Sequence, residues 1–230
     1  MSGDGARAVR RDGRREFDLW YGVARLGVGA VFRAGFRMRF EGVERIPVSG
    51  GALLTYNHVS VLDPLPVALA ATRRGRRVRF LAVSDAFEQR FVGWALRRTG
   101  QIPLRRGLGD WDAIGKIADV LRSGALAGMS PEGTVGYGSA LQPGQRGAAR
   151  IALLAGVPVI PVGVWGMQHR WGKAGLTWTL ERPDVAVVVG LPIPPQGDAR
   201  KRPDVFAFTE RIMDGIGESA EQARSLAGGR

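Results

Sequence analysis

The sequence predicts an α/β domain built on a mixed, mostly parallel central sheet flanked by helices, with an amphipathic helical segment at its N-terminus. Two observations favour this fold class. Short apolar segments bounded by glycine and proline alternate with helical patterns between residues 42 and 204. The apolar segments are nearly continuous, which is typical of parallel strands covered by helices on both faces. The length of 230 residues suits one such domain with a helical appendage.

Residues 1–41 are expected to contain an arm and a helix. Residues 1–15 are polar and rich in arginine, and we expect a disordered basic arm there. In residues 16–41, apolar side chains recur at three- and four-residue spacing, which predicts an amphipathic helical segment. Its aromatic side chains and nearby arginines suit an anionic membrane surface, but packing on the chain's own domain explains the same spacing equally well.

The rest of the chain gives the expected order of strands and helices. Strands are predicted at residues 52–56, 78–83, 125–129, 157–164 and 185–189, and helices at residues 65–71, 87–99, 111–122 and 147–155. The α/β domain is therefore expected to span residues 42–204. An exposed C-terminal helix over residues 205–226 and a short tail to residue 230 should follow it.

Composition excludes several kinds of chemistry. The chain has no cysteine, so disulfides, thiolate metal sites and cysteine nucleophiles are not expected. Its two histidines, His58 and His169, are far apart, so we expect no zinc site and no cofactor. The sequence shows no signal peptide and no uninterrupted apolar stretch of about 18 residues, so no membrane-spanning helix is expected.

The chain is strongly basic, with a formal net charge of +12 and a pI near 11.3, mostly from arginine. This predicts an anionic partner, such as a phospholipid head group or a phosphorylated small molecule. A nucleic-acid partner is not expected, because no nucleic-acid-binding motif occurs and the arginines are scattered. The arginines within residues 73–79 fit either phosphate contacts or a solvated loop.

The first chemically informative segment is residues 57–64, Asn-His-Val-Ser-Val-Leu-Asp-Pro, directly after the predicted strand 52–56. Residues five apart on one helix point about 140° away from each other, so His58 and Asp63 meet only if His58 lies in a turn. Pro64 favours that geometry, because it disfavours helix at Asp63 and suits the start of a new helix. Taken alone, Asp63 would more often be a helix cap, although a carboxylate can accept from a backbone N–H and an imidazole together.

The second informative segment is residues 130–134, Ser-Pro-Glu-Gly-Thr, at the end of the predicted strand 125–129. Pro-Glu-Gly-Thr alone is a weak signal, because proline and glycine form turns and a turn glutamate is usually solvated. Functional residues in α/β sheets gather where strands end and helices begin. Both segments occupy such positions, so a common site is expected.

Four ordered motifs of this chain resemble those of the glycerophospholipid acyltransferase family, whose bacterial members include lysophosphatidic acid acyltransferases. The first is Asn57, His58 and Asp63, and the third is residues 131–134. The second is residues 100–106, Gly-Gln-Ile-Pro-Leu-Arg-Arg, which places Arg106 at the family's arginine position. The fourth is the proline-containing apolar stretch 157–162. The resemblance covers roughly residues 50–164.

Two positions depart from the family pattern. Val135 follows Glu-Gly-Thr, where the family usually has arginine or a polar residue, and Arg105 precedes Arg106, where an acidic residue is frequent. Both departures bear on the head group of the acceptor.

The resemblance implies acyl transfer from acyl-CoA or acyl carrier protein to the hydroxyl of lysophosphatidic acid, which gives phosphatidic acid. His58 would act as the general base and Asp63 would orient it, so that no acyl-enzyme is required. Backbone N–H groups near the Pro64 helix would stabilise the oxyanion. The place of action would be the cytoplasmic face of an anionic membrane, with the protein peripheral or monotopic.

Substrate contacts are expected from Asn57, Ser60, Arg105, Arg106, Glu132, Gly133 and Thr134. Arg106 and Arg105 would hold the acceptor's phosphate, while Glu132 would orient its glycerol hydroxyls. Ser60 should support its loop, because no Gly-x-Ser-x-Gly elbow surrounds it. We interpret His169 as structural.

Two alternatives stay open. The acceptor could be a different lipid, such as a phosphatidylinositol mannoside or a lyso-ornithine lipid, because the same base serves several hydroxyls. The chain could also be a non-catalytic module that binds anionic membranes or nucleic acid through its arginines.

Overall fold

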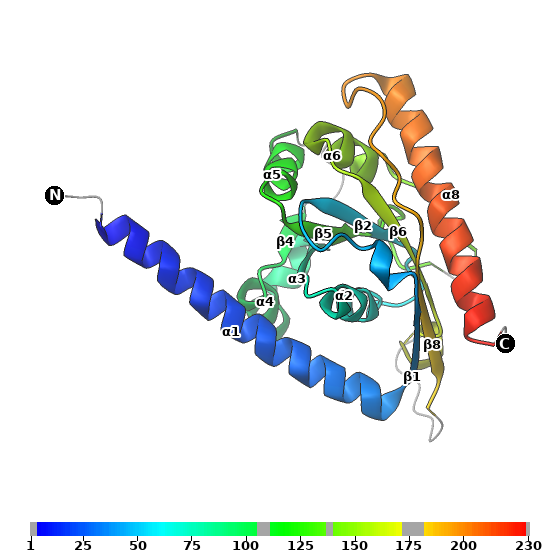
Figure 1. The fold of residues 1–230 in the computed structure, drawn as a ribbon, viewed down its shortest axis with the longest axis horizontal. Coiled ribbons are helices and arrows are strands. Elements are labelled where there is room, and N and C mark those ends of the chain that lie inside the picture. Colours follow the sequence, from blue (N-terminus) through cyan, green and yellow to red (C-terminus); the bar gives the residue numbers. More distant parts are fainter. Residues whose placement is uncertain (1–3, 105–110, 137–139, 172–181, 229–230) are drawn as a thin grey trace.

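The computed structural model describes residues 4–104, 111–136, 140–171 and 182–228. In this part of the chain, seven strands form one sheet in the order β1-β8-β6-β2-β5-β3-β4 (Figure 1). The strands are β1 (Arg37–Glu41), β2 (Ala52–Tyr56), β3 (Val78–Val83), β4 (Ile102–Leu104), β5 (Leu126–Met129), β6 (Val159–Trp165) and β8 (Asp184–Val189). The β6–β8 pair is antiparallel and the other pairs are parallel, which confirms the predicted mixed, mostly parallel α/β fold.

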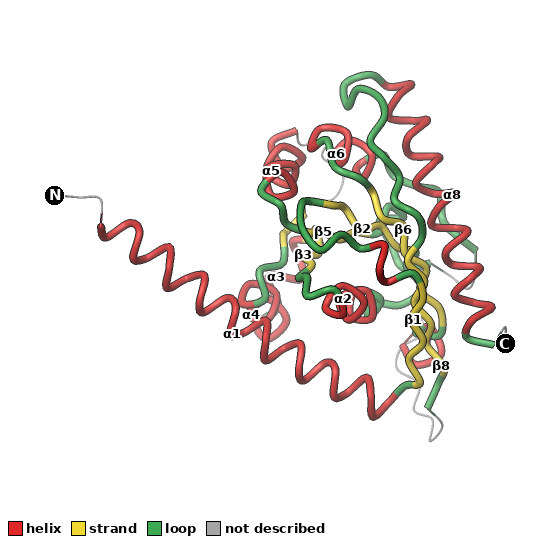
Figure 2. The backbone as a smooth tube through the Cα atoms, viewed as in Figure 1, coloured by secondary structure: helices red, strands yellow, loops and turns green. Residues whose placement is uncertain are grey.

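Helices cover both faces of the sheet (Figures 1 and 2). They are α1 (Asp4–Gly35), η1 (Val43–Arg45), α2 (Pro64–Arg73), α3 (Ser84–Glu88), α4 (Arg90–Arg98), α5 (Trp111–Arg122), α6 (Gly147–Ala155), α7 (Gln168–Trp171) and α8 (Arg202–Leu226). Helices α5, α6 and α8 pack on one face, and α2 and the C-terminal half of α1 pack on the other. None of the helices in the described part of the chain is both long and apolar enough to cross a membrane.

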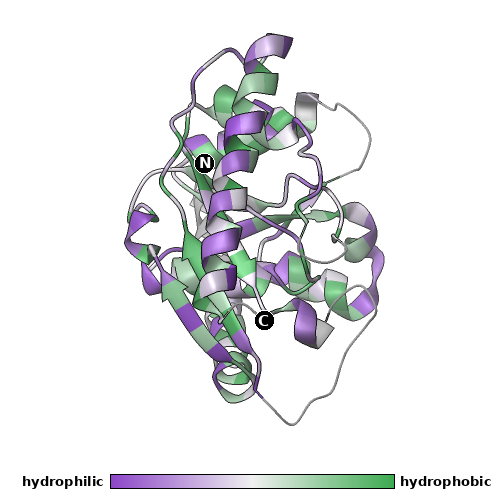
Figure 3. Cartoon of the chain, turned by 90° about the vertical axis from the view of Figure 1, so that its right-hand side faces the viewer, coloured by the Kyte–Doolittle hydropathy of each residue, from purple (hydrophilic) through white to green (hydrophobic). Residues whose placement is uncertain are grey.

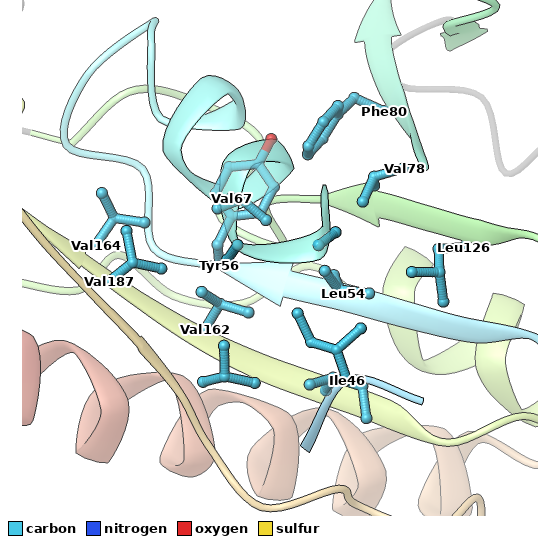
Figure 4. Close-up of a cluster of buried hydrophobic side chains, with 14 of the residues drawn as sticks. Ile46, Leu54, Tyr56, Val67, Val78, Phe80, Leu126, Val162, Val164 and Val187 are labelled. Atoms are coloured by element: carbon cyan, nitrogen blue, oxygen red, sulfur yellow. The ribbon is translucent and has the colours of Figure 1, made fainter. Parts of the chain in front are cut away.

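The strands are apolar throughout because both faces of the sheet are buried. Successive residues of β2 point to opposite faces, so Leu54 joins the cluster under α1 and α2 while Leu53 joins the cluster under α5, α6 and α8. Figure 4 shows the first cluster, where Tyr56 and Val162 pack beside Leu54, and Val67 of α2 covers them.

Most elements agree with the pattern in the sequence. The predicted limits of β2, β3, α5 and α6 are confirmed at both ends. The helix predicted over residues 87–99 is instead a pair, α3 and α4, because Gln89 between them has an extended backbone. Gly93 permits this corner, since a Cβ there would overlap the carbonyl oxygen of Phe87.

The N-terminal segment differs from the prediction at both ends. Helix α1 begins at Asp4, inside the segment expected to be a disordered arm, because alanine and arginine there favour helix. Residues 37–41, predicted to continue the helical segment, form strand β1 instead. Met38 and Phe40 of this strand pack against the core between exposed arginines, and β1 pairs with β8.

The C-terminal helix is not the exposed helix that we expected. Val205, Phe208, Ile212 and Ile216 of α8 are buried against the sheet and α6. Figure 3 looks onto α8 lying across the molecule, with hydrophilic residues recurring along it. The close approach depends on Gly163 of β6, where a Cβ would overlap the carbonyl carbon and oxygen of Ser219. The C-terminal helix therefore belongs to the same packed unit as the sheet.

We predict that Gly163→Ala lowers the free energy of unfolding by about 1–3 kcal/mol, because the added methyl group forces α8 away from β6. Chemical denaturation monitored by circular dichroism measures the change. Gly217→Ala is the matched control, since it lies on α8 with nothing within 4 Å of the added Cβ. It should stabilise the protein by up to about 1 kcal/mol. An unchanged stability of Gly163→Ala would contradict the close packing of α8.

Candidate active site

The candidate site lies where three neighbouring strands end. Strand β2 lies between β5 and β6, and the three run parallel, so the loops that follow them meet at one edge of the sheet (Figure 1). This edge is the usual ligand position in open α/β sheets. The segment 57–63 follows β2, and the segment 130–134 follows β5.

His58 and Asp63 meet as their spacing predicts. His58 lies in the turn between β2 and α2, and its Nδ1 is 3.1 Å from Oδ2 of Asp63. The His58 side chain is 19% exposed, whereas that of Asp63 is fully buried behind it. When Asp63 is ionised, Nδ1–H of His58 donates to it and Nε2 is left as the acceptor.

Asp63 does not cap α2 through its side chain. Its Oδ2 also accepts a hydrogen bond of 2.7 Å from the backbone N–H of Ser60, and no side-chain cap bond is present. Burial raises the pKa of the Asp63 carboxyl above its ordinary value, and the hydrogen bond and charge of His58 offset part of this rise. The site therefore holds a buried carboxylate at a cost in stability.

Asn57 fixes the His58 loop to the end of β6. Its Nδ2 donates to the carbonyl oxygen of Val164 at 2.9 Å, and the N–H of Val164 donates to its Oδ1 at 2.7 Å. The nitrogen and the oxygen of the buried Asn57 amide are thus both hydrogen-bonded to the backbone of one residue, Val164. This geometry supports a scaffolding role rather than the predicted substrate contact.

Glu132 holds the backbone of His58 from the loop after β5. Its Oε1 accepts the N–H of His58 at 2.6 Å, and its Oε2 accepts the N–H of Gln142 at 2.8 Å. The carbonyl oxygen of His58 in turn accepts the N–H of Gly136 at 2.6 Å. The buried carboxylate of Glu132 thus positions His58, in addition to facing the pocket.

The other predicted contacts are distributed differently. Ser60 is fully buried, and its Oγ accepts the N–H of Leu62 at 3.2 Å, which fits loop support. Gly133 has the left-handed φ of +69° that the turn requires, and Thr134 beside it is exposed. Neither of these two lines the pocket described below. Arg105 and Arg106 lie outside the described residues.

The start of α2 does not supply the expected oxyanion donors. Its first three residues include Pro64 and Pro66, which have no N–H. The N–H groups of Leu65 and Val67 donate to carbonyl oxygens of Leu62 and Asp63. The two prolines that favour the turn therefore leave this helix end without free donors in its first four residues.

The arginines of residues 73–79 bind the chain itself. Arg76 donates to the carbonyl oxygens of Pro47, Gly50 and Gly124, Arg74 to that of Ile46, and Arg79 to that of Gly100. The guanidinium groups of Arg73 and Arg77 lie over the rings of Phe40 and Tyr21. Arg74, Arg76 and Arg79 therefore brace neighbouring loops, whereas Arg73 and Arg77 lie exposed at the surface, where both expectations for this segment still apply.

His58 opens into a small pocket at this end of the sheet. The lining residues come from the loops after β2 and β5, from the end of β6 and from α8: Asn57, His58, Val59, Glu132, Gly136, Ala140, Leu141, Trp165, Gly217, Ala220, Glu221 and Arg224. The sequence analysis did not identify the residues of α8 as part of the site. Its residues lie beyond the last motif, and their spacing indicates only a helix. His169, on α7, is exposed and does not line the pocket.

Comparison with known proteins gives consistent matches. A family model described as Acyltransferase matches residues 37–165. The chloroplastic 1-acyl-sn-glycerol-3-phosphate acyltransferase BAT2 of Brassica napus is 28% identical over 186 residues, 78% of this chain and 51% of that protein. The lyso-ornithine lipid O-acyltransferase of Pseudomonas aeruginosa is 30% identical over 172 residues, 62% of this chain and 64% of that protein. The chain spans about half the length of the chloroplast relatives.

A solved structure extends the comparison to the whole fold. The 1-acyl-sn-glycerophosphate acyltransferase PlsC of Thermotoga maritima superposes with a TM-score of 0.68 at 21% identity. The match covers 99% of this chain and 84% of the other. At this identity the likeness establishes a shared fold, including α8 outside the family match.

We predict that Asp63→Asn stabilises the protein increasingly as pH rises. Because burial raises the pKa of Asp63 in the folded state, the folded protein binds this proton more tightly than the unfolded chain. Wild-type stability therefore falls relative to the variant as pH rises from about 4, the ordinary aspartate value, through the raised folded-state pKa. Thermal melts of both proteins between pH 4 and 8 measure the difference.

The control for this experiment is Asp119→Asn, at a largely exposed position on α5. Its melting temperature should follow that of the wild type across the same pH range. A difference between Asp63→Asn and the wild type that stays constant or shrinks with rising pH would contradict the buried-charge interpretation.

Proposed function

This chain belongs to the acyltransferase family, and we propose that it moves a fatty acyl group from a thioester donor to the hydroxyl of lysophosphatidic acid, giving phosphatidic acid. The observation that carries the proposal is the His58–Asp63 pair, held at 3.1 Å and opening into a pocket at the carboxyl ends of β2, β5 and β6. A histidine with a buried carboxylate behind it is the arrangement that removes a proton from a hydroxyl.

The proposed reaction needs one base and no acyl-enzyme. Nε2 of His58 takes the proton of the acceptor hydroxyl while the hydroxyl oxygen attacks the thioester carbonyl. Asp63 stabilises the imidazolium that forms. The tetrahedral intermediate then collapses, the C–S bond breaks, and the departing thiolate takes the proton from His58. The donor is acyl-CoA or acyl carrier protein, since both present the same thioester.

Relatives support the choice of acceptor at two levels. The chloroplastic relatives carry the name 1-acyl-sn-glycerol-3-phosphate acyltransferase, which favours lysophosphatidic acid. The Pseudomonas aeruginosa relative acts, by its name, on a lyso-ornithine lipid, and this is the second candidate acceptor. Both present a lipid hydroxyl to the base, so the same geometry serves either.

We further propose that α1 and α4 place the enzyme on an anionic membrane. Helix α1 is apolar on two sides: its inner side packs on the domain, while Leu19, Val23 and Leu26 are exposed on its outer side. Phe91 of α4 is 85% exposed. On the same helix, Trp94 contacts Trp20 of α1, with ring centroids 5.1 Å apart.

Exposed arginines flank this membrane-facing surface of α1 and α4. They are Arg25, Arg33, Arg90 and Arg97. Arginine beside aromatic and apolar side chains suits anionic head groups over an acyl layer. One side of the N-terminal helix packs on the domain, and its exposed apolar side supports the proposed contact with a bilayer.

The general-base assignment predicts that His58→Ala lowers acyl transfer by about a hundredfold or more. Palmitoyl-CoA and lysophosphatidic acid in detergent micelles are the substrates, and thiol release and lipid product are measured together. His169→Ala is the matched control, because His169 is exposed and outside the pocket, and it should retain wild-type activity. Equal thiol release by the wild type and His58→Ala would exclude His58 as the base.

The membrane proposal predicts that Phe91→Glu weakens binding to phosphatidylglycerol vesicles by about tenfold or more, since it replaces an exposed aromatic side chain, which would insert among the lipids, with a negative charge. Co-sedimentation measures the bound fraction. Phe206→Glu is the matched control, because Phe206 is exposed on α8, which packs on the opposite face of the sheet. If both variants lost binding equally, net charge rather than this surface would account for it.

A further inference from the structure

We propose that Arg224, near the C-terminal end of α8, binds the phosphate of the acceptor in the His58 pocket and so selects phosphate-bearing acceptors. The inference rests on the proposed function, because it assumes that the acceptor hydroxyl lies beside His58. It adds a binding residue that lies outside the four motifs and outside the family match at residues 37–165.

One side of α8 forms a wall of the pocket. Gly217, Ala220, Glu221 and Arg224 follow one another at spacings of three, one and three residues, so they share one side of the helix. The first two are small, which leaves room in the pocket. Glu221 and Arg224 place charged side chains at the same wall.

Arg224 is placed to receive an anion. Its guanidinium lies over the ring of Trp165, 5.3 Å from the centroid, and Trp165 ends β6 beside the His58 loop. Its one ion pair in the described part of the chain, to Glu221, is long at 3.9 Å, and no hydrogen bond from its side chain is formed there. Such a cation–π contact holds a guanidinium in place while leaving N–H donors for an anionic ligand.

Among the described residues that line the pocket, Arg224 is the one whose side chain carries a permanent positive charge. The carboxylate of Glu132 faces the same space, but each of its oxygens already accepts a backbone N–H. Glu221 is 71% exposed, so an entering phosphate can replace it as the partner of Arg224. Arg224 is therefore the group at this wall that can offer charged N–H donors to an entering anion.

The chemistry of the acceptor fits this placement. In lysophosphatidic acid, the free hydroxyl and the phosphate ester are carried by adjacent carbons. A hydroxyl at His58 therefore brings the phosphate into the same pocket, where it needs a cationic partner. Val135, next to the pocket residue Gly136, has no charge to offer, so Arg224 of α8 supplies a cation on this side of the pocket, in addition to the contacts expected from Arg105 and Arg106.

Arg211, a second arginine of α8, provides a comparison for Arg224. Arg211 also lies over an aromatic ring, that of Phe208, at 5.7 Å. Its Nη1, however, donates to the side-chain oxygen of Gln196 at 2.8 Å, and it lies outside the pocket. If Arg224 only complemented the helix dipole or formed a surface pair, its removal would change no more than that of Arg211.

The test compares Arg224→Gln with Arg211→Gln in steady-state kinetics of the full chain. Palmitoyl-CoA is the donor, and the acceptors are lysophosphatidic acid and monoacylglycerol, which lacks the phosphate. We expect Arg224→Gln to raise KM for lysophosphatidic acid by about tenfold or more, with kcat, KM for palmitoyl-CoA and turnover of monoacylglycerol near wild type. Arg211→Gln should resemble the wild type.

A phosphate could also come from the coenzyme A part of the donor, and the kinetics separate the two sources. A rise in KM for palmitoyl-CoA instead of the acceptor would overturn the proposal. An equal loss of kcat with both acceptors would also overturn it, since that result indicates a structural role. Glu221→Gln should act in the opposite direction and lower KM for lysophosphatidic acid, because it removes the competing carboxylate.

Direct binding keeps the inference testable apart from catalysis. Calorimetric titration with a short-chain lysophosphatidic acid below its micelle concentration should show binding to wild type and to Arg211→Gln, and a loss of affinity of about tenfold or more in Arg224→Gln. Unchanged affinity in Arg224→Gln would overturn the proposal. If the wild type binds this ligand but transfers no acyl group to either acceptor, the proposed function fails while the binding role of Arg224 stands.

Discussion

The hydrogen bond from the backbone N–H of His58 to Glu132 joins two loops that lie 74 residues apart in the chain. The rest of the site depends on it. Because Glu132 also accepts from Gln142, its buried carboxylate spans two segments, and losing it would leave both N–H groups without a partner. With its backbone fixed, His58 can turn only its ring, and Asp63 fixes the ring. His58 is thus positioned chiefly by contacts to its backbone.

The sequence predicts those parts of the fold that depend on local pattern. Parallel strands buried on both faces are continuous apolar runs, so β2 and β3 were found with their limits. The turn at His58 followed from Pro64, because proline constrains its own and the preceding residue. Strand β1 was not found, because its alternation lasts five residues and directly follows a helix. Its identity as a strand depends on pairing with β8, far along the chain.

The sequence predicts the central side chains of the site, but not the contacts that hold them in place. His58, Asp63 and Glu132 were identified because their residue types and positions after strands are informative. The partners of Asn57 and Glu132 are backbone groups of distant residues, which no side-chain pattern encodes. The approach of α8 to the pocket depends on a missing Cβ at Gly163, and a glycine in an apolar strand indicates close packing without naming the partner.

The outward side of α1 and α4 also governs how the protein behaves in water. Leu26 and Phe91 are exposed there, and no described segment covers them. Contiguous apolar surface of this kind promotes association between copies in the absence of a bilayer. The net charge of +12 opposes that association, because it makes the copies repel one another. Salt screens the repulsion but spares the apolar attraction. Colloidal stability and the proposed membrane affinity therefore depend on the same surface, and a substitution that improves one is expected to weaken the other.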